Sequence, residues 1–152
     1  MLKELAFQKG WAGKTISRAE TVDRLNPIIR EHMIVNRSYD AVIKAIGDAE
    51  TASALAALQK TARMNASKIA ETIYSCGGVA FNGTDLDPKQ FDLGTGPAAI
   101  ERLQALDSEL LELLKAENQI EHQMRTRAII GVVRASTEDR LTELRSQLMR
   151  LR

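Results

Sequence analysis

The sequence predicts an all-α protein folded as an antiparallel four-helix bundle, with a long crossover between the second and third helices. Three observations support this fold class. Apolar residues recur every three or four positions over long stretches, which is the spacing of one helix face. Only 3 prolines and 9 glycines interrupt the 152 residues, so long helices have room to form. Aromatic residues make up only 4% of the chain, and a core of Leu, Ile, Ala and Met is typical of helical bundles.

A tight turn joins the first two predicted helices. The first helix is expected over 18–46, before Gly47, and the second over 48–75, before a Gly-Gly pair. Helices with so short a connection are antiparallel neighbours. Pro27 lies inside the first helix. It either kinks that helix or marks its true first turn, with Asn26 as the cap.

The second half of the chain begins with a stretch rich in turn residues. Residues 77–96 contain Gly-Gly, Asn-Gly, Asp-Pro and Gly-Thr-Gly, which predict a crossover with turns. Pro97 opens the third helix, which we expect to end within the apolar run 129–133. Residues 136–139 read Ser-Thr-Glu-Asp and resemble a helix cap with acids in the first turn, so the fourth helix should follow them. A solvated face of that helix should carry its arginines, which are Arg140, Arg145, Arg150 and Arg152.

The chain divides into an N-terminal arm, residues 1–17, and a bundle domain, residues 18–152. The arm carries the single tryptophan, Trp11. It either folds back over the bundle or serves as a docking peptide for a protein partner, since tryptophan is a favoured interface anchor. These alternatives stay open at the level of sequence.

Composition excludes some partners and indicates a compartment. The 21 basic and 20 acidic residues are mixed along the chain, whereas nucleic-acid binding needs a concentrated basic face. No apolar run approaches the roughly 20 residues that cross a bilayer, so no membrane partner is expected. A lone cysteine, Cys76, and an N-terminus without a signal-peptide pattern favour a cytoplasmic location.

Polar side chains interrupt the apolar seams near the middle of three predicted helices. They are His32 and Asn36 in the first helix, Asn65 in the second, and Glu117 in the third, with Glu121 and His122 on its next turn. Midpoints share a layer in an antiparallel bundle, so these side chains should meet inside. Because unpaired buried polar groups cost several kcal/mol, we expect them to bond each other, water or an ion.

This polar layer has two interpretations. It is either a hydrogen-bonded layer that fixes helix register, or a metal site built from His32, Glu117 and Glu121. Carboxylate and imidazole ligands in a bundle core are typical of di-iron and di-manganese sites. Such a site needs one Glu from each of two helices and Glu-x-x-His from each of the other two, and the chain does not supply this ligand set. Iron or manganese is the cofactor of the second interpretation, while the first needs no cofactor and no catalytic residue.

A family resemblance rests on residues spread over the first three helices and the crossover. They are Leu25, Ile29 and Tyr39 in the first helix, Leu55, Leu58 and 69–78 in the second, 82–86 in the crossover, and 114–117 in the third. With this order of helices, the chain resembles the ferritin-like superfamily. Within it, the chain is similar to small bacterial four-helix-bundle domains of unknown function related to stress-induced ferritin-like proteins. The resemblance covers about residues 20–150.

The resemblance implies metal-binding Glu, or Glu-x-x-His, near the middle of the helices. Glu117 stands at such a place, but His122 follows it by five residues, so the required spacing is broken. Asn65 and Lys68 stand where the second helix would carry the acid and the histidine. A lysine repels a metal cation, so the departure argues against ferroxidase-type activity.

We therefore expect a non-enzymatic, stress-related ferritin-like bundle that is homo-oligomeric and works through protein contacts. The apolar run 129–133 and the Trp11 arm are the interfaces that this interpretation predicts. The alternative is an iron- or manganese-binding ferritin-like oxidase or storage protein with a non-standard site. Whether the chain is an enzyme therefore stays open in the sequence.

Overall fold

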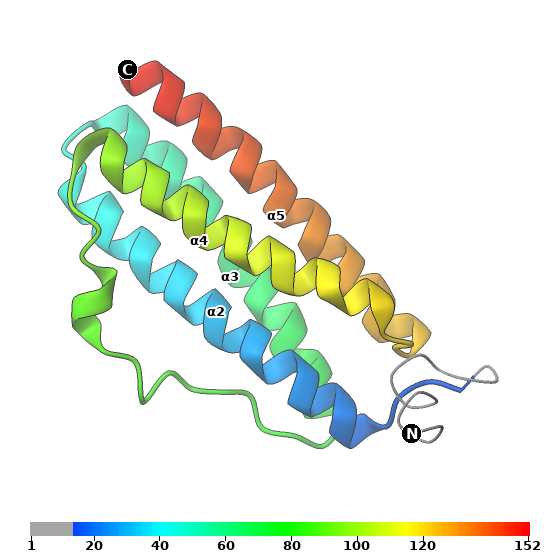
Figure 1. Ribbon diagram of the computed structural model, residues 1–152. Helices are drawn as coiled ribbons and strands as arrows, with labels where there is room; N and C mark the ends of the chain where they lie inside the picture. The colour runs from blue at the N-terminus through cyan, green and yellow to red at the C-terminus, as the bar shows by residue number, and fades with distance from the viewer. Residues whose placement is uncertain (1–13) are drawn as a thin grey trace.

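The computed structural model describes residues 14–152, which form four long helices and no strand (Figure 1). The helices are α2 (Arg18–Ala45), α3 (Ala49–Ser75), α4 (Gly96–Ala116) and α5 (Met124–Leu151). Two short 3₁₀ turns, η2 (Pro88–Phe91) and η3 (Glu117–Gln119), lie in the crossover and directly after α4. The all-helical prediction is confirmed. Trp11 and most of the predicted arm lie outside the described residues.

Each of the four helices packs against two others, with α2 and α5 both lying between α3 and α4. α2 and α5 run in one direction and α3 and α4 in the other (Figure 1). Ion pairs between helix ends agree with these directions. Arg150, at the end of α5, lies 2.8 Å from Asp48, the N-cap of α3, and Arg24, near the start of α2, lies 2.9 Å from Glu117, just after α4.

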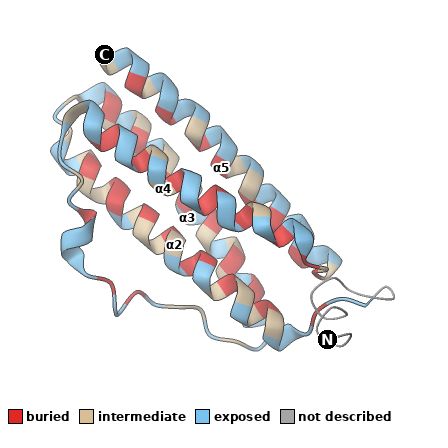
Figure 2. Cartoon of the chain, in the orientation of Figure 1, coloured by how far each residue is buried: buried red, intermediate tan, exposed pale blue. Residues whose placement is uncertain are grey.

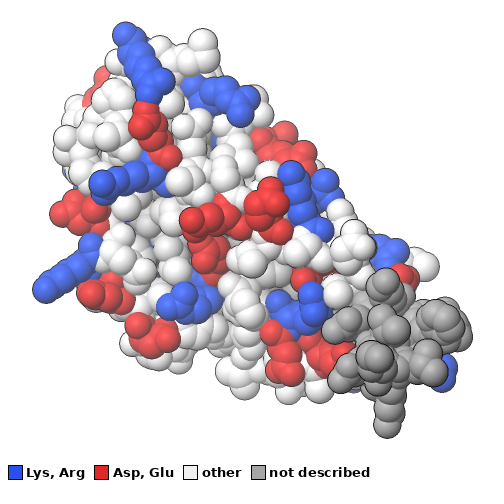
Figure 3. Space-filling view, viewed as in Figure 1, with Lys and Arg blue, Asp and Glu red and all other residues white. Residues whose placement is uncertain are grey.

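The apolar core follows the inward faces of all four helices (Figure 2). Its fully buried members are mostly leucine and isoleucine, among them Leu25, Leu55, Ile69, Leu103 and Leu144. Burial of each such side chain stabilises the fold by about 1.5–3 kcal/mol. The outer faces are polar, and basic and acidic side chains are interspersed over the side shown in Figure 3. Among the described helices, none combines the length and the apolar composition that a membrane span requires.

The first two helices begin and end close to where the sequence predicted. The Asp48 side chain caps α3 by accepting a hydrogen bond from the amide of Thr51 at 3.0 Å. Gly77, after α3, has a φ of +83°, a conformation that costs glycine little. At Gly78, an added Cβ would lie 2.5 Å from Val22, so the absence of a side chain lets the chain pass close to α2.

Pro27 lies inside α2, which continues on both sides of it. Asn26 is not a helix cap but an anchor for the crossover. Its amide nitrogen donates to the carbonyl of Val79 at 3.1 Å, and its side-chain oxygen accepts from the amide of Phe81 at 2.8 Å. Arg30 lies over the Phe81 ring, 6.0 Å from its centre. The crossover is therefore fastened along α2, which brings the chain from the end of α3 to the start of α4 (Figure 1).

The predicted boundary between the third and fourth helices was wrong. α4 ends at Ala116 and α5 begins at Met124, so residues 129–133 and 136–139 lie inside α5. The turn between the helices is closed by backbone hydrogen bonds from Ile120 to Glu117 and from His122 to Ile120, at 3.1 and 3.0 Å. A third bond, from the amide of Ile16 to the carbonyl of Glu121, ties this turn to the segment before α2. These contacts break the helix although residues 117–123 contain neither glycine nor proline.

Candidate functional site

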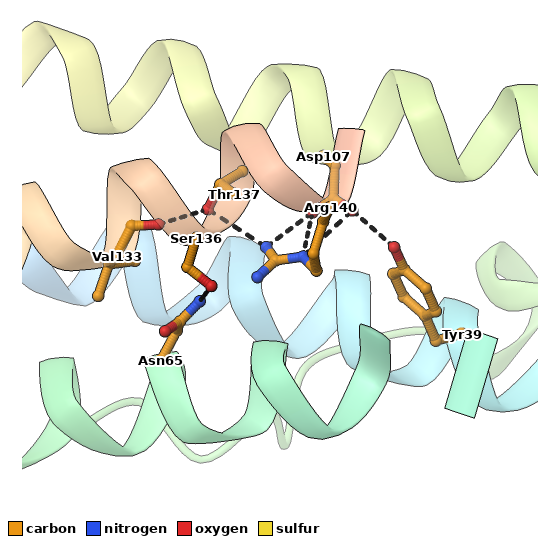
Figure 4. A network of polar contacts seen from close by, with 7 residues as sticks. All are labelled: Tyr39, Asn65, Asp107, Val133, Ser136, Thr137 and Arg140. Atoms are coloured by element: carbon orange, nitrogen blue, oxygen red, sulfur yellow. Dashed lines mark hydrogen bonds and ion pairs between the residues drawn. The ribbon is translucent and has the colours of Figure 1, made fainter. Parts of the chain in front are cut away.

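A network of polar side chains lies in the middle of the bundle (Figure 4). Arg140 of α5 places Nη2 2.9 Å from Oδ1 of Asp107 on α4, and the two side chains are 1% and 0% exposed. Tyr39 of α2 donates its hydroxyl to Oδ2 of Asp107 at 2.7 Å. Burial, followed by the charge and hydrogen bond of Asp107, raises the pKa of Tyr39 well above its ordinary value. The tyrosine therefore stays protonated and serves as a donor.

The position of Arg140 corrects the prediction of a solvated arginine face. Because α5 begins at Met124, Arg140 falls past the middle of a 28-residue helix and faces inward. A buried guanidinium requires a counter-charge, and Asp107 supplies it from within the leucine seam of α4. Arg140 also donates to the hydroxyl of Thr137, one turn earlier on α5, at 3.3 Å.

The predicted polar layer is present in part. His32 and Asn65 are 0% and 3% exposed, while Asn36 is half-buried. The amide of Asn65 donates to the hydroxyl of Ser136 on α5 at 2.8 Å. Neither ring nitrogen of His32 has a hydrogen-bond partner within residues 14–152. Burial, followed by the positive charge of Arg140, lowers the pKa of His32 to about 3, so the ring is neutral.

A second polar cluster lies at the end of the bundle where α4 gives way to α5. Arg24 of α2 donates two hydrogen bonds to the Glu117 carboxylate, from Nε at 2.9 Å and from Nη2 at 3.0 Å. Nε2 of His122 lies 2.8 Å from Oε1 of the same carboxylate, and His122 is 2% exposed. Burial raises the pKa of Glu117, but the hydrogen bonds from His122 and Arg24 outweigh it and hold that pKa below its ordinary value. Glu117 is therefore an anion that fixes the orientation of the imidazole.

The structure does not bring the three predicted metal ligands together. Glu117 stands after the end of α4 and not at mid-helix, so it does not share a layer with His32. His32 instead lies close enough to Arg140 for the positive charge of the arginine to lower the pKa of the histidine. Glu121 pairs with Arg127, whose Nη2 lies 2.6 Å from Oε1 of the glutamate. Over the described range, no three His, Cys, Asp or Glu side chains form a group that could hold a metal ion.

Acidic side chains line a shallow groove between α2 and α4. They are Glu31 of α2 and Glu109 and Glu112 of α4, with Ser108 and Leu113 beside them. Burial, followed by repulsion from Glu109, raises the pKa of Glu31. The two carboxylates are therefore close enough to disfavour full ionisation of both.

A groove of about 570 Å³ lies between α3 and α5, and Ser136, Asp139 and Glu143 contribute polar side chains to its lining. Leu58 and Thr61 of α3 and Val132 and Ala135 of α5 line it. Val132 is 50% exposed, and Met64 on α3 is 55% exposed. Part of the predicted apolar run 129–133 is thus accessible at the surface of the bundle.

Comparison with known proteins gives no relative: no family model matches the chain, and no curated protein or solved structure matches it significantly. The fold and its two polar clusters define an all-helical bundle with a buried arginine–aspartate pair at its centre and a carboxylate–imidazole pair at one end.

Proposed function

We propose that this chain is a non-enzymatic ferritin-like bundle that works through contacts with protein chains, first of all with copies of itself. Two features support the ferritin-like assignment. Each packed pair of helices runs in opposite directions (Figure 1). One long connection, from the end of α3 to the start of α4, crosses the length of the bundle, and ferritin-like folds carry one such crossover.

One observation carries the non-enzymatic part of the proposal. Ferritin-like oxidases hold their metal ions in the bundle core, between glutamates and Glu-x-x-His pairs. Here the core holds the guanidinium of Arg140, which already neutralises Asp107 at 2.9 Å. A metal ion at this place would have to displace a buried cation and leave it unpaired, which costs several kcal/mol.

The groove between α3 and α5 is the proposed contact surface. Its exposed apolar side chain Val132 is of the kind that an assembled interface covers, and Met64 is a further exposed apolar side chain of α3. Homo-oligomers most often form with two-fold symmetry, in which the same patch on both copies makes the contact. A second copy is therefore the occupant that we propose for this groove.

Val132→Glu tests the contact surface. We expect it to weaken self-association at least about tenfold, because burying an unpaired carboxylate costs more than the 1.4 kcal/mol to which tenfold corresponds. Sedimentation velocity over a range of concentrations measures the association. Met149→Glu is the matched control, since Met149 is a 70% exposed residue of α5 that does not line the groove. Wild-type protein that stays monomeric at every concentration would contradict the proposal.

A metal-dependent oxidase or storage protein is the second candidate, and one observation favours it. Glu117 and His122, two common ligand types, lie 2.8 Å apart beside a pocket. Mass spectrometry of the purified protein, before and after incubation with ferrous iron in air, tests this candidate. Near-stoichiometric iron that is lost in Glu117→Ala would support the metal-dependent function and displace our proposal. Because Arg24 occupies both oxygens of Glu117, we expect no such binding.

A further inference from the structure

The carboxylate–imidazole pair borders a hollow of about 230 Å³ beside the turn between α4 and α5. Asn118 and His122 line it from the turn, and Arg127 and Arg134 line it from α5. Gly131 forms part of its wall, and an added Cβ there would meet nothing within 4 Å. The hollow therefore combines room for a small molecule with a concentration of hydrogen-bonding groups.

His122 lines the hollow, and one of its two ring nitrogens has no hydrogen-bond partner within residues 14–152. Its Nε2 lies 2.8 Å from the anionic Glu117, so Nε2 carries the proton and donates. In the neutral ring Nδ1 is then an acceptor. Nδ1 is buried and finds no hydrogen-bond partner among the residues that the structure describes. A buried acceptor of this kind favours a ligand that offers it an O–H or N–H group.

The two arginines add donors for an anion. Arg127 contacts Glu121 and Arg134 contacts Glu138, the latter from Nε at 3.1 Å. Each guanidinium has five N–H donors, so one ion pair leaves several of them available. Both ion pairs are between one-third and about half exposed, and pairs of that kind contribute little stability. Arg127 and Arg134 can therefore turn toward a ligand at small cost.

We propose that this hollow binds inorganic hydrogen phosphate. Hydrogen phosphate has oxygen acceptors for Arg127 and Arg134 and, unlike sulfate or a carboxylate at neutral pH, one O–H group for Nδ1 of His122. The site is separate from the groove between α3 and α5, so it stands independently of the proposed self-association.

Isothermal titration calorimetry with inorganic phosphate, sulfate and a simple phosphate monoester tests the site on the full chain. We expect phosphate to bind and sulfate to bind at least about tenfold more weakly, since sulfate leaves the Nδ1 acceptor unpaired. Phosphate monoester at a pH where it is fully ionised lacks the O–H group and should behave like sulfate. Equal binding of phosphate and sulfate would overturn the role of His122, and no heat with phosphate at millimolar concentration would overturn the site.

Two arginine variants distinguish specific phosphate binding in the hollow from nonspecific attraction of anions to a basic surface. Arg134→Met should weaken phosphate binding about tenfold or more, because it removes charge-assisted hydrogen bonds. Arg145→Met, at an exposed position of α5 away from the hollow, should leave binding unchanged. Arg134 is 33% exposed and Arg145 lies at an exposed position, so neither change should unfold the bundle, and circular dichroism checks this. Equal weakening by both variants would overturn the proposal.

Discussion

Asp107→Leu is expected to destabilise the fold by about 3–5 kcal/mol, because it leaves the charge of Arg140 buried without a counter-charge. The arginine side chain is only 1% exposed. Within the described residues, its remaining side-chain partner is the neutral hydroxyl of Thr137. Tyr39 also loses its acceptor. Equilibrium unfolding in urea at neutral pH measures the loss.

Removing both charges should give a different result. Asp107→Leu combined with Arg140→Met and Tyr39→Phe replaces the network by apolar side chains, and we expect stability equal to wild type or up to about 4 kcal/mol higher. Glu138→Gln is the matched control for an exposed pair, since Arg134 and Glu138 are 33% and 49% exposed. It should cost at most about 1 kcal/mol. A cost for Asp107→Leu as small as that of the control would contradict the buried pair.

The first half of the bundle was predictable from sequence because its boundaries carry local signals. Gly47 and Asp48 mark the first turn, and Gly77 and Gly78 mark the end of α3. Gly47, Asp48 and Gly77 act within a few positions of themselves, through a positive φ or a cap. The all-helical class and the buried positions of His32 and Asn65 followed from the same local periodicity.

The second half was less predictable because contacts distant in sequence decide it. Ile120 and Met124 continue the apolar spacing across the real break, and nothing in residues 117–123 is a strong helix breaker. The turn is instead stabilised by the backbone hydrogen bond from Ile16 to Glu121 and by the ion pair between Arg24 and Glu117. Local sequence signals therefore predict an α4 that is too long, with Glu117 at mid-helix.

The wrong boundary between the third and fourth helices also explains why the sequence does not predict the buried ion pair at the centre of the bundle. With the fourth helix expected to start after residue 139, Arg140 fell in its first turn and was assigned to solvent. Asp107 has no distinguishing signal in the sequence, because it stands among leucines of the α4 seam and its partner is 33 positions away. A buried ion pair between helices has no periodic signature of its own. The candidate site at the end of the bundle is predictable in part, because Glu117 and His122 interrupt an apolar seam in the sequence whereas Arg24 does not.

His32→Leu is expected to remove an acid sensitivity of the fold. The unfolded chain protonates this histidine near its ordinary pKa of 6.5, whereas burial and Arg140 lower the pKa in the folded state to about 3. Between these values the unfolded state binds the extra proton, so falling pH destabilises the wild type by up to about 1.4 kcal/mol per pH unit. Above pH 7 this contribution to stability is fully present. Urea unfolding at several values between pH 7 and pH 4 measures the slope.

The variant should therefore gain stability relative to wild type as the pH falls. Asn36→Leu, one turn further along α2, is the control, because it removes a polar group that does not titrate and should keep the wild-type slope. At neutral pH, His32→Leu should be at least as stable as wild type, since two buried nitrogens without a partner in the described chain disappear. Parallel curves for wild type and His32→Leu would contradict this account. They would mean that the folded chain accepts the proton on His32, which a guanidinium fixed nearby by Asp107 opposes.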